Sequence, residues 1–296
     1  MTIATTISNE WTRLIRFIDP QGNVRFGQPI LKGEELTAEQ VSSGQLQAYA
    51  IEGEIFGKHR VTDTVLTVSK LLAPIEPPFY RGIGLNYKKH AVETNAPIPK
   101  YPIVFIKPPH TTVGPLQPIV IPPHCQDGQV DYEAELAVVI GRPCRNVCKE
   151  EALAYVAGYT ACNDVSARKW QLQLGGGQWV YGKGFDSFNP IGPMIVSPKI
   201  IKNPNALRLG TKINGKVFQD WTTEDMIFDI ASLVSYLSQG ATLEPGEVII
   251  TGTPHGVGAG RNPPVWLQDK DVCEIFVEKI GSLVNPVVFE RAVNKL

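Results

Sequence analysis

The chain has 296 residues, of which 43% are hydrophobic and 19% are charged, so we expect a folded core rather than global disorder. Its 28 Lys and Arg residues balance 29 Asp and Glu residues, which leaves no basic excess to bind a phosphate backbone. The longest apolar runs, such as residues 136–140, fall far short of the roughly 18 residues of a membrane span. We therefore expect neither a nucleic acid nor a membrane partner.

The N-terminus predicts a short tail and no secretion signal, because no charged segment is followed by an apolar stretch. Residues 1–16 contain Ser, Thr and two Arg, which leaves a mitochondrial presequence as the alternative, but they also contain Glu10. Five scattered cysteines, an odd number, are typical of reduced thiols in a cytosolic protein. We therefore expect a cytoplasmic location.

The first 75 residues predict a small β-rich domain. Residues 11–18 and 24–26 predict two strands, and the pentad between them is rich in turn formers: Pro presets φ, and Gly or Asn takes the left-handed position. Residues 61–68 predict a further strand. Three prolines between residues 74 and 78 then interrupt the chain. We expect a small N-terminal domain over 1–75 and a catalytic domain over 76–296.

The larger part predicts mainly strands. Short apolar segments broken by Gly and Pro predict them over 103–107, 119–121, 132–140, 193–196, 211–213, 247–251 and 271–277. Helices are expected over 150–157 and, more clearly, over 225–238, where apolar residues recur at helical spacing. The strands follow one another too closely for βαβ units throughout. We therefore expect an α+β fold that is mainly β.

A first candidate site lies on a short predicted helix after Gly82-Ile83-Gly84. His90 and Glu93 are three residues apart, so a helix places them on one face, where a carboxylate orients an imidazole and raises its basicity. Such a pair serves as a general base for water; a surface capping pair is the alternative. The glycine pair lacks the third glycine of a dinucleotide fingerprint, which argues against a nicotinamide oxidoreductase.

An acidic segment, residues 131–136, predicts a metal site. On a strand Glu133 and Glu135 share one face, where two carboxylates repel each other unless a cation lies between them. A hard divalent ion, Mg²⁺ or Mn²⁺ with Ca²⁺ as a further option, suits such oxygen ligands. Asp164 ends an apolar run and is either a third ligand or a helix N-cap. A solvated strand face is the alternative, but the apolar residues 136–140 favour burial.

Three further segments carry groups suited to an anion. Arg168 and Gln171 share a helix face and suit a substrate carboxylate, or form a solvent-facing pair. Lys183 stands between two glycines, so its ammonium can neutralise an oxyanion at close approach; a loop lysine is the alternative. Residues 249–258, which include Thr253, run into a Gly-rich turn whose hydroxyls and amides suit an anion. Neither a P-loop nor the Gly-x-Ser-x-Gly elbow of serine hydrolases occurs.

Five motifs in this order resemble the fumarylacetoacetate hydrolase (FAH) superfamily over about residues 79–290. They are residues 84–87 with His90 and Glu93, residues 131–136, residues 163–168, residues 182–186 and residues 251–254. Within the superfamily, Gln178-Trp179 and residues 261–265 look most similar to the FAH domain-containing protein 2 branch, for which oxaloacetate tautomerase activity is known.

The resemblance implies a mixed β-sandwich roll, called the FAH fold, with a small N-terminal domain and a homodimeric assembly. It also implies an Mg²⁺ or Mn²⁺ ion, a catalytic set and a substrate-binding set. The implied residues are Glu133, Glu135 and Asp164 for the metal; His90, Glu93 and Lys183 for catalysis; and Arg168, Gln171 and Thr253 for substrate binding.

Residues and resemblance together predict a divalent-metal-dependent enzyme that acts on a small 2-oxo acid or 1,3-dicarbonyl through a metal-stabilised enolate. We expect hydrolytic carbon–carbon cleavage of the acylpyruvate or fumarylacetoacetate type, in which Glu93 holds His90 and His90 activates water. Keto–enol tautomerisation or decarboxylation of oxaloacetate at the same site is the alternative. An inert metal-binding scaffold is the alternative of another class, and turnover of any 2-oxo acid distinguishes it.

Overall fold

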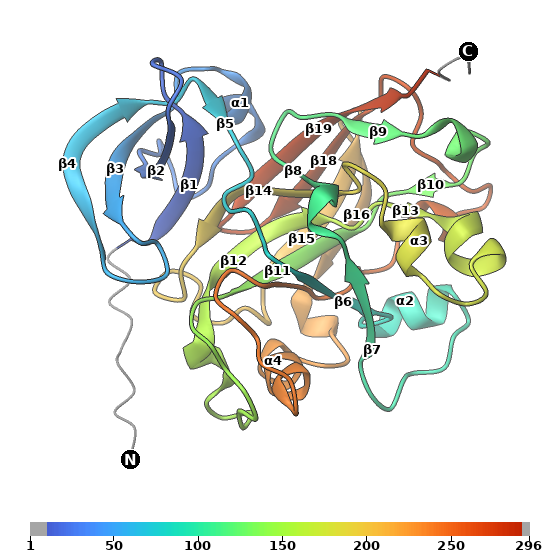
Figure 1. Cartoon of the computed structure of the whole chain (residues 1–296). Helices are drawn as coiled ribbons and strands as arrows, with labels where there is room; N and C mark the ends of the chain where they lie inside the picture. Colours follow the sequence, from blue (N-terminus) through green and yellow to red (C-terminus); the bar gives the residue numbers. More distant parts are fainter. Residues whose placement is uncertain (1–10, 292–296) are drawn as a thin grey trace, which may run out of the picture.

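The computed structural model describes residues 11–291, which adopt the expected mainly β, α+β fold (Figure 1). The expected N-terminal tail, residues 1–10, lies outside the described residues. The strands are β1 Arg13–Ile18, β2 Val24–Pro29, β3 Gln47–Gly53, β4 His59–Thr67, β5 Lys70–Leu71, β6 Tyr80–Gly84, β7 Ile103–Lys107, β8 Thr112–Val113, β9 Ile119–Ile121, β10 Val130–Asp131, β11 Ala134–Ile140, β12 Val156–Asn163, β13 Ser166–Ala167, β14 Asn189–Val196, β15 Arg208–Ile213, β16 Lys216–Thr222, β17 Val248–Ile250, β18 Val272–Val277 and β19 Gly281–Phe289.

Helices are short within this part of the chain. The α-helices are α1 Ala38–Ser42, α2 Lys88–Glu93, α3 Val180–Lys183 and α4 Ile230–Ser238. A π-helix spans Trp170–Leu174, and 3₁₀ turns span Pro109–Thr111, Pro123–Cys125, Ala152–Tyr155, Thr223–Asp225 and Gly258–Gly260. Among residues 11–291, no helix has the length and apolar character needed to cross a membrane.

A large open sheet organises the fold, with strand order β4-β3-β2-β1-β14-β12-β11-β17-β6-β7; β5 also pairs with β1, and β8 with β14. The N-terminal strands continue this sheet, because β1 pairs with β14 through Arg13 opposite Val196 and Leu14 opposite Ile195. The division into domains at residue 75 therefore stays a proposal. Near the far end of the sheet, β17 pairs with β11 on one side and with β6 on the other, and β7 follows β6. This pairing places the glycine pair of β6 near the acidic end of β11.

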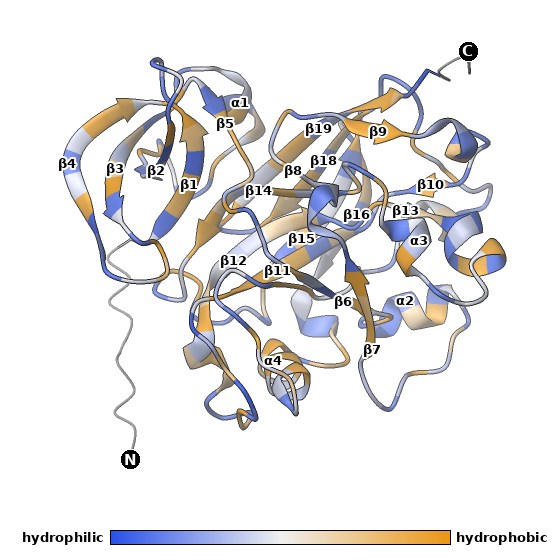
Figure 2. Ribbon diagram, in the orientation of Figure 1, coloured by the Kyte–Doolittle hydropathy of each residue, from blue (hydrophilic) through white to orange (hydrophobic). Residues whose placement is uncertain are grey.

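A second sheet, of order β16-β15-β18-β19-β9, packs on the first, with β15 against β11 and with β18 and β19 against β12. Side chains alternate along β11: Leu136 and Val138 belong to the core that also contains residues of β15, β18 and β19, whereas Ala137 and Val139 belong to a second core. Figure 2 shows that β9 is hydrophobic throughout, and both of its isoleucines are buried. The result is a mixed β-sandwich.

The helix expected over 150–157 is wrong. Only Ala152–Tyr155 forms a 3₁₀ turn, and β12 begins at Val156. All eight residues of β12 are buried, so neither face of the strand is exposed and the alternating signal of a half-exposed strand is missing. Periodicity alone cannot distinguish a fully buried strand of this kind from a buried helix.

The helix expected over 225–238 is confirmed only from Ile230, where α4 begins. Asp229 caps it by accepting a hydrogen bond from the N–H of Ser232 at 2.8 Å. The residues before it are held in another conformation by Asn86, whose carbonyl accepts from the N–H of Ile227 and whose Oδ1 accepts from the N–H of Phe228. This long-range contact overrides the helical periodicity.

Candidate active site

The His–Glu pair lies on α2, as expected, and is mostly buried rather than a surface capping pair. Nδ1 of His90 lies 2.8 Å from Oε2 of Glu93, and the N–H of Gly256 donates to Oε1 of Glu93 at 2.8 Å. Because an ionised carboxylate only accepts hydrogen bonds, the proton at this contact lies on Nδ1, and in the neutral form of the ring the lone pair is then on Nε2. Burial alone would raise the pKa of Glu93, but the hydrogen bonds from His90 and Gly256 outweigh it and lower that pKa. Glu93 is therefore ionised at neutral pH.

The loop at 256–260 lies so close to its neighbours that a Cβ at Gly258 or Gly260 would collide with them. A Cβ on Gly260 would lie 2.5 Å from Cδ of Glu93, and a Cβ on Gly258 would lie 1.8 Å from the carbonyl oxygen of Val265. Gly256 has a positive φ of 98°, which favours glycine as well. The glycines therefore let the loop pass close enough for the N–H of Gly256 to reach Glu93.

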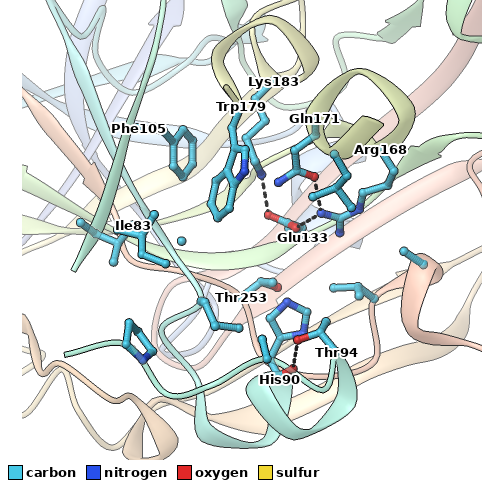
Figure 3. Close-up of a pocket in the computed structure, with 18 of the residues that line it drawn as sticks. Ile83, His90, Thr94, Phe105, Glu133, Arg168, Gln171, Trp179, Lys183 and Thr253 are labelled. Atoms are coloured by element: carbon cyan, nitrogen blue, oxygen red, sulfur yellow. Dashed lines mark hydrogen bonds and ion pairs between the residues drawn. The ribbon is translucent and has the colours of Figure 1, made fainter. Parts of the chain in front are cut away.

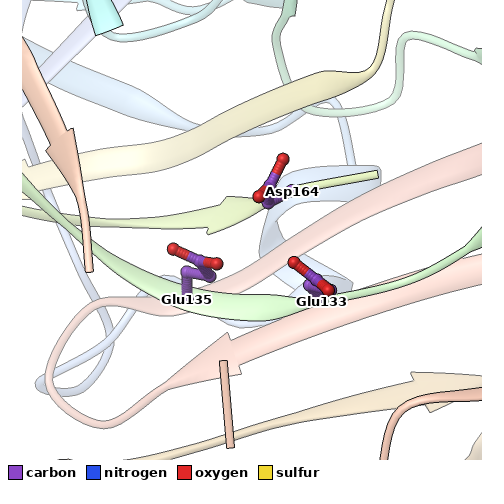
Figure 4. A group of neighbouring side chains, drawn as sticks. All are labelled: Glu133, Glu135 and Asp164. Atoms are coloured by element: carbon purple, nitrogen blue, oxygen red, sulfur yellow. The ribbon is translucent and has the colours of Figure 1, made fainter. Parts of the chain in front are cut away.

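The carboxylate cluster of Glu133, Glu135 and Asp164 forms at the junction of β11 and β12 (Figure 4). Each residue offers one oxygen, and these oxygens all lie within 4.8 Å of one another. All three side chains are buried, so this is no solvated strand face. Asp164 does not cap a helix; its N–H instead donates to the carbonyl of Glu133 at 3.0 Å.

Two buried lysines lie against the cluster. Nζ of Lys183 donates to Oε2 of Glu133 at 2.9 Å, to Oδ2 of Asp164 at 2.6 Å and to Oγ of Ser166 at 2.6 Å, which uses its three N–H donors. Burial would lower the pKa of Lys183, but Asp164 and Glu133 outweigh it and raise that pKa. Lys107 pairs with Asp164 on the other side, and burial holds its pKa below the usual value. Lys183 is thus no mobile loop lysine.

Glu135 is the member of the cluster that lacks a lysine or arginine in contact among the residues described. Its Oε2 accepts from the N–H of Gly252 at 2.7 Å. Burial, followed by the charges of Asp164 and Glu133, raises the pKa of Glu135 well above its usual value. Lys183 and Arg168 lower the pKa of the equally buried Glu133. A divalent cation fits this donor set, because it would supply the positive charge that Glu135 is missing and prefers oxygen ligands of this kind.

Arg168 joins the cluster to the glycine loop through Asp131. Nε of Arg168 donates to Oδ2 of Asp131 at 2.8 Å, while Nη1 contacts Oε1 of Glu133 at 2.7 Å and donates to Oε1 of Gln171 at 2.9 Å. Asp131 also accepts from the N–H groups of Gly258 and Ala259. Arg168 and Gln171 therefore form an internal pair rather than a solvent-facing one. Because the side-chain oxygen of Gln171 is bonded to Arg168, its amide nitrogen remains as the hydrogen-bond donor toward a ligand.

Thr253 is held by a buried glutamine from the second sheet. Nε2 of Gln219 donates to Oγ1 of Thr253 at 2.8 Å and to the carbonyl of Pro254 at 2.8 Å, while Oε1 of Gln219 accepts from the N–H of Ala134. Because Oγ1 of Thr253 already accepts a hydrogen bond, its own proton is left to donate. Thr253 thus presents a hydroxyl donor.

These groups meet in a cavity of about 530 Å³ (Figure 3). Seven of the nine residues expected to form the site line it, and the other two, Glu93 and Asp164, contact lining residues directly. In Figure 3, His90 and Thr253 lie across the cavity from Glu133 and Arg168. The seven lining residues are His90, Glu133, Glu135, Arg168, Gln171, Lys183 and Thr253.

Sequence reasoning assigned no role to Lys107, Asp131 or Gln219. Lys107 carried a usable signal, since it is a lone charge at the end of an apolar strand. Asp131 and Gln219 carried none, because both act on backbone amides of segments more than 80 residues away in sequence. The glycine pair of β6 also has a structural reason: Gly84 lies under the ring of Trp179, where a Cβ would come within 2.1 Å of Cζ3.

Residues 80–288 match the family described as fumarylacetoacetate (FAA) hydrolase C-terminal. The fumarylacetoacetate hydrolase domain-containing protein 2 homolog of Dictyostelium discoideum is 49% identical over 227 residues, which cover 74% of each chain. Oxaloacetate tautomerase FAHD2A, mitochondrial, of Homo sapiens is 43% identical over 218 residues, which cover 73% of this chain and 69% of the human protein.

Solved structures extend the likeness to both parts of the fold. The crystal structure of Cg1458 with inhibitor has a TM-score of 0.82 at 33% identity and covers 94% of this chain and 100% of that chain. The crystal structure of 2-hydroxyhepta-2,4-diene-1,7-dioate isomerase from Mycobacterium marinum has a TM-score of 0.78 at 37% identity and covers 94% and 99% of the two chains. The chain therefore belongs to the fumarylacetoacetate hydrolase family.

Proposed function

We propose that this chain catalyses the keto–enol tautomerisation of a 2-oxo acid, and oxaloacetate is the first compound to test. The observation that carries the proposal is that His90, which is bonded to Glu93, lines the same cavity as Glu133 and Glu135 of the buried carboxylate cluster. Enolisation needs a base for the C3 proton and positive charge at the carbonyl oxygen, and the two sides of this cavity are suited to supply them.

The dyad is suited to move the proton. Nε2 of His90 holds the lone pair that accepts the proton from C3, while the electron pair of the broken C–H bond forms the enolate. Glu93 is ionised, so it stabilises the imidazolium that results, and the loop amide of Gly256 keeps its carboxylate in place. Return of the proton to the substrate oxygen completes the enol and restores the neutral imidazole beside the ionised Glu93.

We assign the metal site to Glu133, Glu135 and Asp164, with Mg²⁺ or Mn²⁺ as the ion. When bound, such an ion acts as a Lewis acid that stabilises negative charge on a carbonyl oxygen. Lys183 adds a fixed positive charge beside the same carboxylates.

The substrate carboxylate is assigned to two donors that line the cavity, one bonded to Arg168 and one across the cavity from it. Gln171 presents its amide nitrogen, because its carbonyl is bonded to Arg168. Thr253 presents its hydroxyl proton, because its oxygen is bonded to Gln219. The positive charge of Arg168 favours an anion at the same place.

Hydrolytic carbon–carbon cleavage is the second candidate, because the same dyad is equally suited to take a proton from water. The human relative named oxaloacetate tautomerase and the mycobacterial neighbour named an isomerase favour proton transfer without cleavage. We therefore place tautomerisation before hydrolysis, and oxaloacetate decarboxylation after both.

The test compares oxaloacetate and acetylpyruvate in D₂O with Mg²⁺, before and after chelation, with NMR to identify the products. We expect metal-dependent acceleration of deuterium incorporation at C3 of oxaloacetate without loss of the substrate. Acetate and pyruvate from acetylpyruvate would favour hydrolysis, and CO₂ from oxaloacetate would favour decarboxylation. Absence of metal-dependent turnover with either compound would contradict an enzymatic role and support the inert scaffold.

A Gly260→Ala variant is expected to lose activity without losing stability. The new Cβ would displace the carboxylate of Glu93, which is the flexible end of a side chain, so the backbone need not move. A misplaced dyad should lower kcat by on the order of 10- to 100-fold, while the free energy of unfolding changes by less than about 1 kcal/mol. The matched control is Gly33→Ala, where a Cβ meets open space. Equal kcat values for the two variants would contradict the claim that activity depends on the position of the Glu93 carboxylate beside Gly260.

We also propose that the chain forms a homodimer, as the family resemblance implies, and light scattering of the purified protein tests this. The location is proposed to be the cytoplasm, and the mitochondrion named for the human relative is the alternative. Fractionation of cells that express the full chain distinguishes the two.

A further inference from the structure

The cavity is divided chemically into two ends. Its charged lining residues all belong to the carboxylate cluster, the lysine and arginine that contact it, or the dyad. The other end is lined by aromatic and aliphatic side chains, and Figure 3 shows Ile83, Phe105 and Trp179 together on the side away from Arg168. The two ends therefore suit different parts of one ligand.

The apolar end is rigidly built. A Cβ on Gly82 would lie 2.1 Å from Cζ of Phe105, and Gly84 meets the ring of Trp179 as closely, so both rings rest directly on the backbone of β6. The ring centroids lie 5.7 Å apart, within the range of favourable aromatic pairs. Ile103 on β7 extends this wall toward the solvent.

The apolar end offers no partner for a second carboxylate. Arg168 and Lys183 are the cations that line the cavity, and both are engaged by carboxylates of the polar end. Nζ of Lys183 lies 5.0 Å from the centroid of the Phe105 ring, but its three N–H donors are already used. A second carboxylate placed farther out, against Ile103 and Trp179, would lose its hydration without gaining a hydrogen-bond partner, which is unfavourable. An uncharged apolar group would gain free energy from the same burial.

The size of the cavity points in the same direction. Oxaloacetate has nine non-hydrogen atoms, which occupy at most about 270 Å³ if each is given the ~30 Å³ of a water molecule in the liquid. This is about half of the 530 Å³ available. A dianion of that size, held at the polar end, would leave the apolar end without contacts.

We propose that the substrate of this chain is a 2-oxo acid whose far end is an uncharged apolar arm, held against Ile103, Phe105 and Trp179. The inference rests on the enolisation proposed above and names the substrate class for it. Trp179 and Ile103 are then specificity-determining residues. A buried methylene contributes about 0.8 kcal/mol, so each methylene of the arm is expected to raise kcat/KM roughly fourfold.

The experiment measures kcat/KM for ketonisation of the enols of phenylpyruvate and oxaloacetate, which share the reacting atoms and differ in the arm. We expect the Mg²⁺-loaded enzyme to prefer phenylpyruvate by about tenfold or more. Ile103→Lys places a cation at the apolar end and should lower this preference at least tenfold. Its control is Val104→Lys, because Val104 is equally exposed on β7 but does not line the cavity, and the preference should stay within twofold.

A third variant, Trp179→Leu, should lower kcat/KM for phenylpyruvate at least tenfold more than for oxaloacetate. Preference of the unmodified enzyme for oxaloacetate, or equal effects of the two lysine variants, would overturn the apolar arm while leaving enolisation intact. Absence of metal-dependent ketonisation with both substrates would overturn enolisation itself, and the inference with it.

Discussion

A His90→Ala variant is expected to lower kcat for enolisation by roughly 100- to 10,000-fold, the usual contribution of a general base. The reason is its position, since His90 lines the cavity opposite the carboxylate cluster and its Nδ1 is held by Glu93. The affinity for Mn²⁺ should change by less than about twofold, because His90 is not one of the clustered carboxylates.

The control for this variant is His110→Ala, which removes an exposed histidine from outside the cavity. Stopped-flow ketonisation assays give kcat, and calorimetric titration gives the metal affinity. If His90→Ala lost metal affinity in proportion to activity, His90 would be structural, and the proton-transfer role would have to be given up.

A Glu135→Gln variant is expected to lower the affinity for Mn²⁺ by about 100-fold or more, since loss of groups that merely support metal ligands already costs 10- to 100-fold. Glu135 is the most informative member of the cluster because it contacts no lysine or arginine within residues 11–291. Removal of Glu133 or Asp164 would instead also take away one of the two carboxylates that pair with Lys183, so its effect could not be assigned to the metal alone. Glu150→Gln is the control at an exposed glutamate.

The same variant should stabilise the metal-free protein. The pKa of Glu135 is raised in the folded state, so its contribution to stability is complete below its unfolded pKa near 4.5 and is lost as the pH rises through the folded value. Wild type and Glu135→Gln should therefore unfold alike near pH 4, and the variant should be the more stable by on the order of 1–3 kcal/mol at pH 7. A less stable variant at pH 7 would contradict the electrostatic reading of the cluster.

The sequence predicted those elements whose own residues decide their structure. The strands at 103–107 and 119–121 and the short helix of His90 and Glu93 are all present, because local patterning and local hydrogen bonds suffice there. The helix expected over 150–157 failed because Val156 opens a strand that is buried on both faces. The early start expected for α4 failed because Asn86, far away in sequence, bonds to the segment before it.

In the candidate site, too, local patterning predicted what neighbouring residues decide and missed what long-range packing decides. Side-chain alternation sufficed to predict that Glu133 and Glu135 lie together, although β11 itself begins at Ala134, one residue after Glu133. Spacing could not predict that the donors of Lys183 are all engaged by the cluster and Ser166, because that depends on the packing of α3 against β13. The expected contact of Lys183 with substrate is therefore proposed here as a charge effect.

Asp131 shows most clearly what sequence patterning misses. Its carboxylate accepts hydrogen bonds from Gly258 and Ala259 on one side and from Arg168 on the other. The loop on the first side continues to Gly256, which holds Glu93. One buried aspartate thus connects the dyad wall to the carboxylate wall, through contacts that a motif alone does not reveal.

The central claim is that one divalent ion binds in the carboxylate cluster and faces the dyad across a single cavity. Titration of the metal-free protein with Mn²⁺, followed by NMR of the histidine ring protons, tests it directly. The account predicts one ion per chain and strong broadening of the signal that His90→Ala removes, with no broadening in Glu135→Gln. Binding of Mn²⁺ that leaves the His90 signal sharp, or broadening that persists in Glu135→Gln, would contradict it.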